Sequence, residues 1–235
     1  MIASAIDDSQ RKAARVAGFF YLFTFAVVVY ANFAIHERLN VAGDAAKTAQ
    51  NILAHESLWR VGVMCDLVYC IGLIAILAAL YVIQKPVSEG LTLVATLWKL
   101  AYALTWFVMT LQLFDALRLI HAPDYLRVFE TARLQALAKL YLSGRFDRYY
   151  GGLLFYALGG TVSSYLWVKS RYIPNALAWF GVVAYAWCAF CAFMFLLMPA
   201  FEKFVNLWFF DTAMGLFELA LGVWLLVKGL REVRA

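Results

Sequence analysis

Apolar stretches long enough to cross a bilayer follow one another through almost the whole chain. The six stretches cover residues 16–35, 59–83, 91–114, 150–168, 175–198 and 207–227. About 20 apolar residues suffice, because a helix rises about 1.5 Å per residue and the hydrocarbon core is about 30 Å thick. Lipid offers no partner to open backbone groups, and the chain has no alternating barrel pattern, so each stretch is expected to be a helix. The sequence therefore predicts an all-α polytopic membrane protein, a six-transmembrane-helix bundle.

Composition agrees with this fold class and limits the partners. The 235 residues are 65% hydrophobic and 15% charged, whereas a typical soluble domain is about 25% charged. So little sequence lies outside the apolar stretches that we expect a single integral membrane domain over residues 1–235. We attribute the net charge of +5 to loops and termini that meet anionic headgroups, and we expect no nucleic acid. The expected partners are membrane lipids together with a small hydrophobic ligand or a membrane-protein partner, and no cofactor is expected.

The distribution of Lys and Arg predicts which side of the membrane holds the termini. Arg11, Lys12 and Arg15 precede a first stretch of full spanning length with no small-residue cleavage site, which indicates a retained helix rather than a signal peptide. The two sides of the predicted bundle carry nearly equal numbers of basic residues. Charges that flank short loops weigh most in the positive-inside rule, and the shortest connections, 84–90 and 169–174, lie on the side of the termini. Both termini are therefore predicted to be cytoplasmic.

Two connections on the opposite side are predicted to contain short amphipathic helices. Residues 43–55 have Asp44 at the position of an N-cap, followed by an apolar stripe. Residues 124–142 place apolar residues on one face, namely Leu126, Phe129, Leu137 and Leu140. The second helix is expected either to lie along the lipid headgroups or to pack on the spans as a simple connector.

Three charged residues interrupt the predicted spans. They are Asp66, Lys99 and Glu218, and a charge at mid-bilayer costs roughly 2.5–3.5 kcal/mol unless it meets a partner, a cavity or water. Glu218 shares a helical stripe with Gly215 and Gly222, so it is expected to face another helix and not lipid. Lys99 and Glu218 lie roughly 12 and 14 Å from the cytoplasmic ends of their spans, and Asp66 lies roughly 10 Å from the other end of its span. Lys99 and Glu218 therefore share a level.

This placement predicts a polar centre inside the membrane. We expect a buried pair of Lys99 and Glu218, with Asp66 nearby. Four tyrosines are expected to surround the pair: Tyr69, Tyr102, Tyr156 and Tyr185. The predicted ligand-binding residues are these seven. A paired buried charge can also serve only to fix the register of the helices, and that interpretation stays open.

The histidines suggest a different and weaker site. His36, His55 and His121 all lie on the predicted outer side, and two of them precede a glutamate. Imidazoles with carboxylates can hold zinc and activate water, but the spacing of a zinc-protease helix motif is absent. These residues are candidate metal ligands on residue type alone.

Several segments, taken in order, resemble a known family. They are ARVAG at 14–18, GDAAKTAQNIL at 43–53, SLWRVG at 57–62, SRYIP at 170–174 and ELALGVWLLVKG at 218–229. Over nearly its whole length the chain resembles the bacterial membrane-protein family called domain of unknown function 4386. The resemblance implies a multi-span protein of the bacterial inner membrane. It implies no activity and no catalytic residue, because the family has no established function.

Three functions are compatible with the sequence. The first is binding or transport of a small or lipid-like ligand at the polar centre, with protonation of a carboxylate changing the occupancy. The second is a non-catalytic accessory subunit of a membrane complex, in which the buried pair is structural. The third is an intramembrane metal-dependent hydrolase that uses the outer His and Glu groups. The sequence favours the first, and no catalytic residue is assigned.

Overall fold

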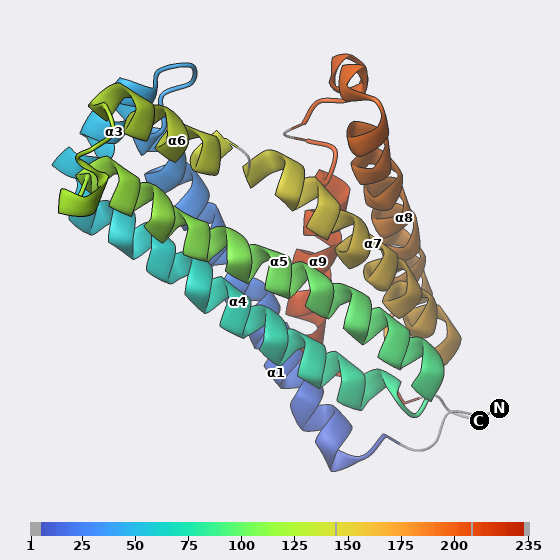
Figure 1. Cartoon of the computed structure of the whole chain (residues 1–235). Coiled ribbons are helices and arrows are strands. Elements are labelled where there is room, and N and C mark those ends of the chain that lie inside the picture. The colour runs from blue at the N-terminus through green and yellow to red at the C-terminus, as the bar shows by residue number, and fades with distance from the viewer. Residues whose placement is uncertain (1–5, 144, 208, 233–235) are drawn as a thin grey trace. The chain divides into compact units, whose positions relative to one another are not determined.

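The computed structural model describes residues 6–143, 145–207 and 209–232, and these residues form helices and connections with no strand (Figure 1). The long helices are α1 (Asp8–Val29), α4 (Glu56–Gln84), α5 (Glu89–His121), α7 (Arg145–Ser170), α8 (Asn175–Leu197) and α9 (Thr212–Val227). The shorter ones are a π-helix (Tyr30–His36), α2 (Glu37–Leu39), α3 (Ala45–Ala54), α6 (Thr131–Ser143) and two 3₁₀ turns (Asp124–Leu126 and Pro199–Lys203).

The structure contains a helix at each of the six predicted apolar stretches, but these helices differ in length and hydropathy. Within the described residues, four segments are long and apolar enough to cross a membrane: Asp8–Leu39, Glu56–Gln84, Glu89–His121 and Asn175–Leu197. Helix α9 has 16 residues, which at about 1.5 Å per residue is shorter than the hydrocarbon core. Helix α7 has 26 residues but is less apolar, because it is rich in Gly, Ser and Tyr and carries charge near both ends. The all-α membrane fold is confirmed, and the number of spans stays a prediction.

The chain divides into two compact units, and neither is a continuous piece of sequence. The first unit comprises residues 1–25, 71–104 and 150–235, and the second comprises residues 26–70 and 105–149. The sequence contains no linker at which one unit could be cut from the other. A single membrane domain over the whole chain stays a prediction.

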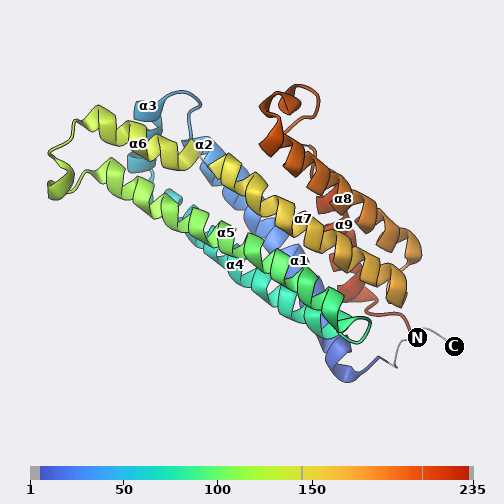
Figure 2. The same cartoon turned by 45° about the vertical axis from the view of Figure 1, so that its right-hand side comes forward.

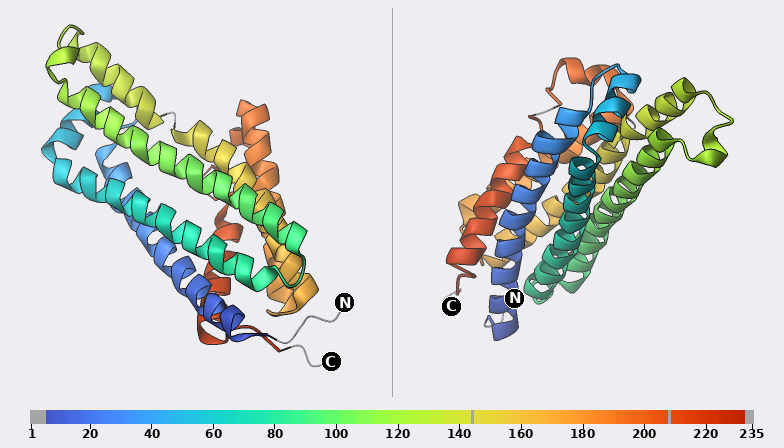
Figure 3. Two further views of the ribbon diagram at one scale, coloured as in Figure 1. Left: turned by 60° about the horizontal axis from the view of Figure 1, so that its bottom comes forward. Right: turned by 90° about the vertical axis from the view of Figure 1, so that its left-hand side faces the viewer.

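In the first unit the helices approach closely at small residues. Helices α8 and α9 pack along each other (Figure 2). A side chain on Gly18 of α1 would place its Cβ 2.6 Å from the backbone nitrogen of Leu226 and 2.8 Å from the carbonyl oxygen of Gly222, both on α9. The beginning of α1 therefore packs against the end of α9, as Figure 3 also shows. Small residues serve this purpose in membrane helices, where close backbone approach replaces the hydrophobic drive available in water.

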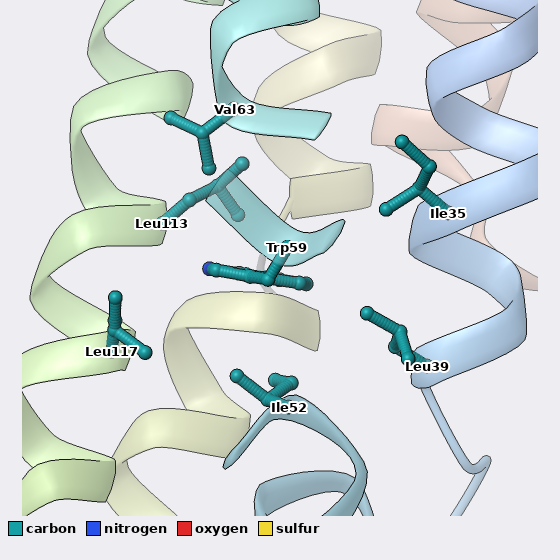
Figure 4. Close-up of a cluster of buried hydrophobic side chains, with 7 residues drawn as sticks. All are labelled: Ile35, Leu39, Ile52, Trp59, Val63, Leu113 and Leu117. Atoms are coloured by element: carbon teal, nitrogen blue, oxygen red, sulfur yellow. The ribbon is translucent and has the colours of Figure 1, made fainter. Parts of the chain in front are cut away.

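In the second unit a hydrophobic cluster joins five elements around Trp59 (Figure 4). Leu113 and Leu117 of α5 lie on one side of the indole, and Ile35 and Leu39 lie on the other. Ile52 of α3 and Val63 of α4 complete the cluster. The apolar side of α3 is thus buried, as its sequence predicts, and Asp44 caps the helix by accepting a hydrogen bond from the Lys47 backbone nitrogen at 2.9 Å.

The prediction of one amphipathic helix over residues 124–142 is wrong in its extent and its buried face. A 3₁₀ turn covers Asp124–Leu126, and α6 starts only at Thr131, where the Glu130 carbonyl accepts the first helical hydrogen bonds. Leu134 and Ala138 are the buried residues of α6, whereas Phe129, Leu137 and Leu140 are exposed. The difference arises because α6 packs on α3 (Figures 1 and 2), and that contact selects the side of the helix that carries Leu134.

Lys139 fastens α6 to the loop before α3. Its Nζ donates hydrogen bonds to Asn40 Oδ1 at 2.6 Å and to the Val41 carbonyl oxygen at 2.7 Å. Burial lowers the pKa of Lys139, while the negative charge of Asp44 acts in the opposite direction. Lys139 therefore holds two segments of the second unit together.

We predict that Lys139→Met loosens this contact and destabilises the second unit by about 1–2 kcal/mol, because hydrogen bonds from a charged donor are lost. Faster amide hydrogen exchange over residues 40–54, measured on the protein in lipid nanodiscs, would report the change. Lys47→Met is the matched control, since the Lys47 side chain is exposed. Equal exchange in the two variants would contradict the role given to Lys139.

Candidate functional site

The first unit gathers a lysine, three tyrosines and a glutamate from four helices. Lys99 and Tyr102 come from α5, Tyr156 from α7, Tyr185 from α8 and Glu218 from α9. Lys99 is only 3% exposed, the three tyrosines are buried, and Glu218 is partly buried. Five of the seven predicted ligand-binding residues thus lie in one unit.

Two tyrosine hydroxyl groups converge on one oxygen of Glu218. Tyr156 Oη donates to Glu218 Oε1 at 2.5 Å, and Tyr185 Oη donates to the same oxygen at 2.6 Å. Hydrogen bonds from hydroxyl groups to a carboxylate are short when the acceptor is ionised, and both distances fall in that range. The two bonds tie α7, α8 and α9 together at one point.

Lys99 faces the same two tyrosines from another side. Its Nζ lies 5.1 Å from the centre of the Tyr156 ring and 5.2 Å from that of Tyr185, which is the geometry of a cation–π contact. No direct ion pair joins Lys99 to Glu218 among the described residues. Lys99 and Glu218 therefore interact at longer range than an ion pair, and the two phenol groups contact both charges.

Two atoms of this cluster have bonding capacity left over. In the part of the chain that the structure describes, Glu218 Oε2 accepts no hydrogen bond and Lys99 Nζ donates none. A buried ammonium group without an acceptor is costly, because its charge has left water without gaining hydrogen bonds in return. A further polar group at this cluster would find its hydrogen bonds at Lys99 Nζ or Glu218 Oε2.

Tyr102 extends the aromatic wall on the α5 side. Its ring centre lies 4.7 Å from that of Tyr156, and the Tyr156 and Tyr185 rings meet edge to face at 6.0 Å. Aromatic pairs at these spacings attract one another beyond the area that they bury. The wall is apolar apart from the hydroxyl groups.

Adjacent glycines on α7 make room for the cluster. A Cβ on Gly160 would lie 2.2 Å from the Tyr185 ring, and a Cβ on Gly159 would lie 2.7 Å from the Ala95 carbonyl oxygen and 2.9 Å from Lys99 Cγ. Any larger residue would displace the tyrosine or the lysine. The small residues of this predicted span therefore position Lys99 and also Tyr185, which contacts Glu218.

Asp66 has a different partner, in the second unit. Asp66 Oδ2 lies 2.9 Å from His36 Nε2, and the two residues are 1% and 6% exposed. The Trp59 ring meets the imidazole edge to face at 5.3 Å, and a Cβ on Gly62 would lie 3.0 Å from His36 Cε1. The structure therefore pairs Asp66 with a residue that the sequence suggests only as a metal ligand.

His36 was missed as this partner because the first span was expected to end at residue 35. The helical segment continues through a π-helix (Tyr30–His36) to Leu39, so His36 still points into the packed helices. One-turn π segments are found frequently at functional sites. Tyr69, the other predicted member in this unit, packs against Trp106 with ring centres 4.8 Å apart and ring planes tilted by 57°.

The histidines lie in separate environments. His36 contacts Asp66, His121 Nε2 lies 2.9 Å from Glu56 Oε2 near the surface, and His55 follows the end of α3. Among the described residues, no three His, Cys, Asp or Glu side chains are grouped so that they could hold a metal ion. The metal-dependent hydrolase therefore receives no support from the geometry.

We predict that Gly160→Ala lowers thermal stability in lipid nanodiscs by about 1–3 kcal/mol, because the new methyl group collides with the buried Tyr185 ring. Gly151→Ala, on the same helix, is the matched control. Nothing lies within 4 Å of a Cβ built at Gly151. Alanine is the better helix former by up to about 1 kcal/mol, so the control should be neutral or stabilising. The same change in both variants would argue against the packing described for α7.

Comparison with known proteins assigns the chain to a family and to no activity. The family model described as "Domain of unknown function (DUF4386)" matches residues 16–229. Searches of curated proteins and of solved structures gave no match. The match includes every residue of the cluster around Lys99 and Glu218 and of the contact between His36 and Asp66. It leaves out only the first turns of α1 among the long helices. The chain belongs to the family of domain of unknown function 4386.

Proposed function

We propose that this chain is a six-span protein of the bacterial inner membrane, with both termini in the cytoplasm, that binds or transports a small or lipid-like ligand at Lys99 and Glu218. Support for six spans comes from the cluster itself. Helices α5 and α8 belong to segments that are long and apolar enough to cross a membrane. Tyr156 on α7 contacts Lys99, one third of the way along α5, and Glu218 on α9 contacts Tyr185, halfway along α8. Helices α7 and α9 would therefore enter the membrane to the depth of these residues.

The observation that carries the ligand proposal is the unused bonding capacity of a buried cation. Lys99 is almost fully buried, contacts two ring faces and finds no acceptor in the described part of the chain. A ligand with an acceptor atom would satisfy Nζ, and the walls formed by Tyr102, Tyr156 and Tyr185 would contact its apolar part. Ligand sites with mostly apolar walls and a few placed polar groups are the common kind.

Glu218 would couple occupancy to protonation. With Glu218 ionised, the cluster is neutral, because the carboxylate balances Lys99. With Glu218 protonated, the cluster carries one positive charge and favours an anionic polar group. Carboxylates at membrane depth are the usual components of proton-coupled sites.

The competing proposal is an accessory subunit whose cluster only fixes helix packing. The glycines against Tyr185 and Lys99 are compatible with it, since they show that the helices fit tightly at this point. The two proposals differ in what Lys99→Met would do. A structural cluster would lose stability, whereas a ligand site would lose a bound molecule.

We predict that native mass spectrometry of the full chain, extracted from its membrane in a mild detergent, detects a retained small molecule. Lys99→Met should reduce its occupancy about tenfold, equivalent to about 1.4 kcal/mol. Glu218→Gln, which mimics the protonated carboxyl group, should raise the occupancy of an anionic molecule. Lys169→Met is the control, because Lys169 is exposed at the end of α7. Tyr156→Phe removes the hydrogen bond to Glu218 but keeps the ring that contacts Lys99, so this variant tests the two contacts separately.

An unchanged mass profile in Glu218→Gln and Lys99→Met, combined with a lower unfolding temperature, would support the accessory role and overturn the ligand proposal. Loss of the bound molecule in Lys99→Met at an unchanged unfolding temperature would support the ligand site.

A further inference from the structure

A small basic cavity lies where the beginning of α1 meets the end of α9. Its volume is about 170 Å³, far above the roughly 10–15 Å³ needed to admit one water molecule. The charged residues that line it are Arg11, Arg15, Lys228 and Glu232. None of its lining residues belongs to the group around Lys99, so its role is independent of the proposed function.

The segment after α9 folds back to form one wall of the cavity. Gly229 has a φ of 68°, a left-handed conformation that turns the chain, and its backbone nitrogen bonds to the Trp224 carbonyl oxygen at 3.1 Å. The Arg231 backbone nitrogen then donates to the Tyr172 carbonyl oxygen at 2.8 Å, and its guanidinium stacks on Trp224 at 4.7 Å. The cavity is thus built by specific contacts and is not a gap between loose ends.

The charge in the cavity is unbalanced. Arg11 Nη2 lies 2.8 Å from Glu232 Oε1, so this carboxylate is already paired. In the described part of the chain, Arg15 and Lys228 form no ion pair. Three cations and one carboxylate leave two positive charges around the cavity, and an anion with several acceptor oxygens would suit this arrangement.

The position of the cavity relative to the apolar parts of α1 and α9 indicates which kind of anion would bind there. Arg15 directly precedes the exposed Val16, and Lys228 directly follows the exposed Val227. The cavity therefore lies at the level where apolar side chains begin, which is the level of lipid headgroups. Basic pockets between membrane helices commonly hold such headgroups.

We propose that Arg15 and Lys228, beside the paired Arg11, bind a phosphate group, carried at this depth by an anionic phospholipid. The phosphate oxygens accept from Arg15 and Lys228, and the acyl chains lie along the exposed apolar residues at the adjoining ends of α1 and α9. Glu232 opposes binding, because it occupies Arg11 and repels the anion.

The test is native mass spectrometry of the full chain in detergent, titrated with phosphatidylglycerol or with phosphatidylcholine of the same acyl chains. We expect the wild type to retain phosphatidylglycerol preferentially and Arg15→Gln/Lys228→Gln to lose this preference by about tenfold. Lys12→Gln/Lys169→Gln removes the same two charges at exposed positions outside the cavity and should keep the preference. Glu232→Gln should strengthen retention, an effect that a purely structural ion pair would not give.

A second arm replaces the lipid with inorganic phosphate. Stabilisation of the wild type, but not of Arg15→Gln/Lys228→Gln, by phosphate without any lipid preference would assign the site to free phosphate and overturn the lipid source. Equal behaviour of the cavity variant and the Lys12→Gln/Lys169→Gln control towards both ligands would overturn the site altogether.

Discussion

One carboxylate oxygen, Glu218 Oε1, receives two tyrosine hydroxyl groups whose ring faces contact a buried ammonium. The first unit depends on this arrangement, because it places opposite charges in an apolar interior without a direct ion pair. Each tyrosine contacts the anion through its hydroxyl group and the cation through its ring. The desolvation of Glu218 is thereby offset by hydrogen bonds, while that of Lys99 is offset only by ring faces. The asymmetry makes Lys99 the group with the most to gain from a further contact.

This arrangement requires glycine where the helices touch. Tyr185 can reach Glu218 because position 160 of α7 has no side chain, and Lys99 lies against α7 because position 159 has none. In lipid no hydrophobic gain drives helices together, so close packing and polar contacts must supply the association energy. The glycines and the polar cluster therefore act jointly: the first permits the approach that the second stabilises. Gly18 has the same role between α1 and α9, where the backbones come close without a polar group.

The sequence predicted the helices well and the polar partners only in part. Apolar stretches of spanning length identify membrane helices because every backbone group in lipid must find its hydrogen bond within the helix. Asp44 identifies the start of α3 because an N-cap bonds a backbone group only a few residues further along the chain. The grouping of Lys99 with Tyr102, Tyr156, Tyr185 and Glu218 followed from charge and depth. The His36–Asp66 contact did not follow, because a π-helix prolongs the first helical segment beyond residue 35. The buried side of α6 could not be predicted either, because the contact with α3, which is distant in sequence, decides which side is buried.

The two units each bury one acid, and the acids are compensated in different ways. Asp66 has an imidazole at hydrogen-bond distance, in a site closed by Trp59 and by the backbone at Gly62. Glu218 is only partly buried, and neutral hydroxyl groups contact one of its oxygens while the other has no hydrogen bond in the described part of the chain. A change of charge at Asp66 would therefore act first on an imidazole, whereas one at Glu218 would act first on two tyrosines whose rings also contact Lys99.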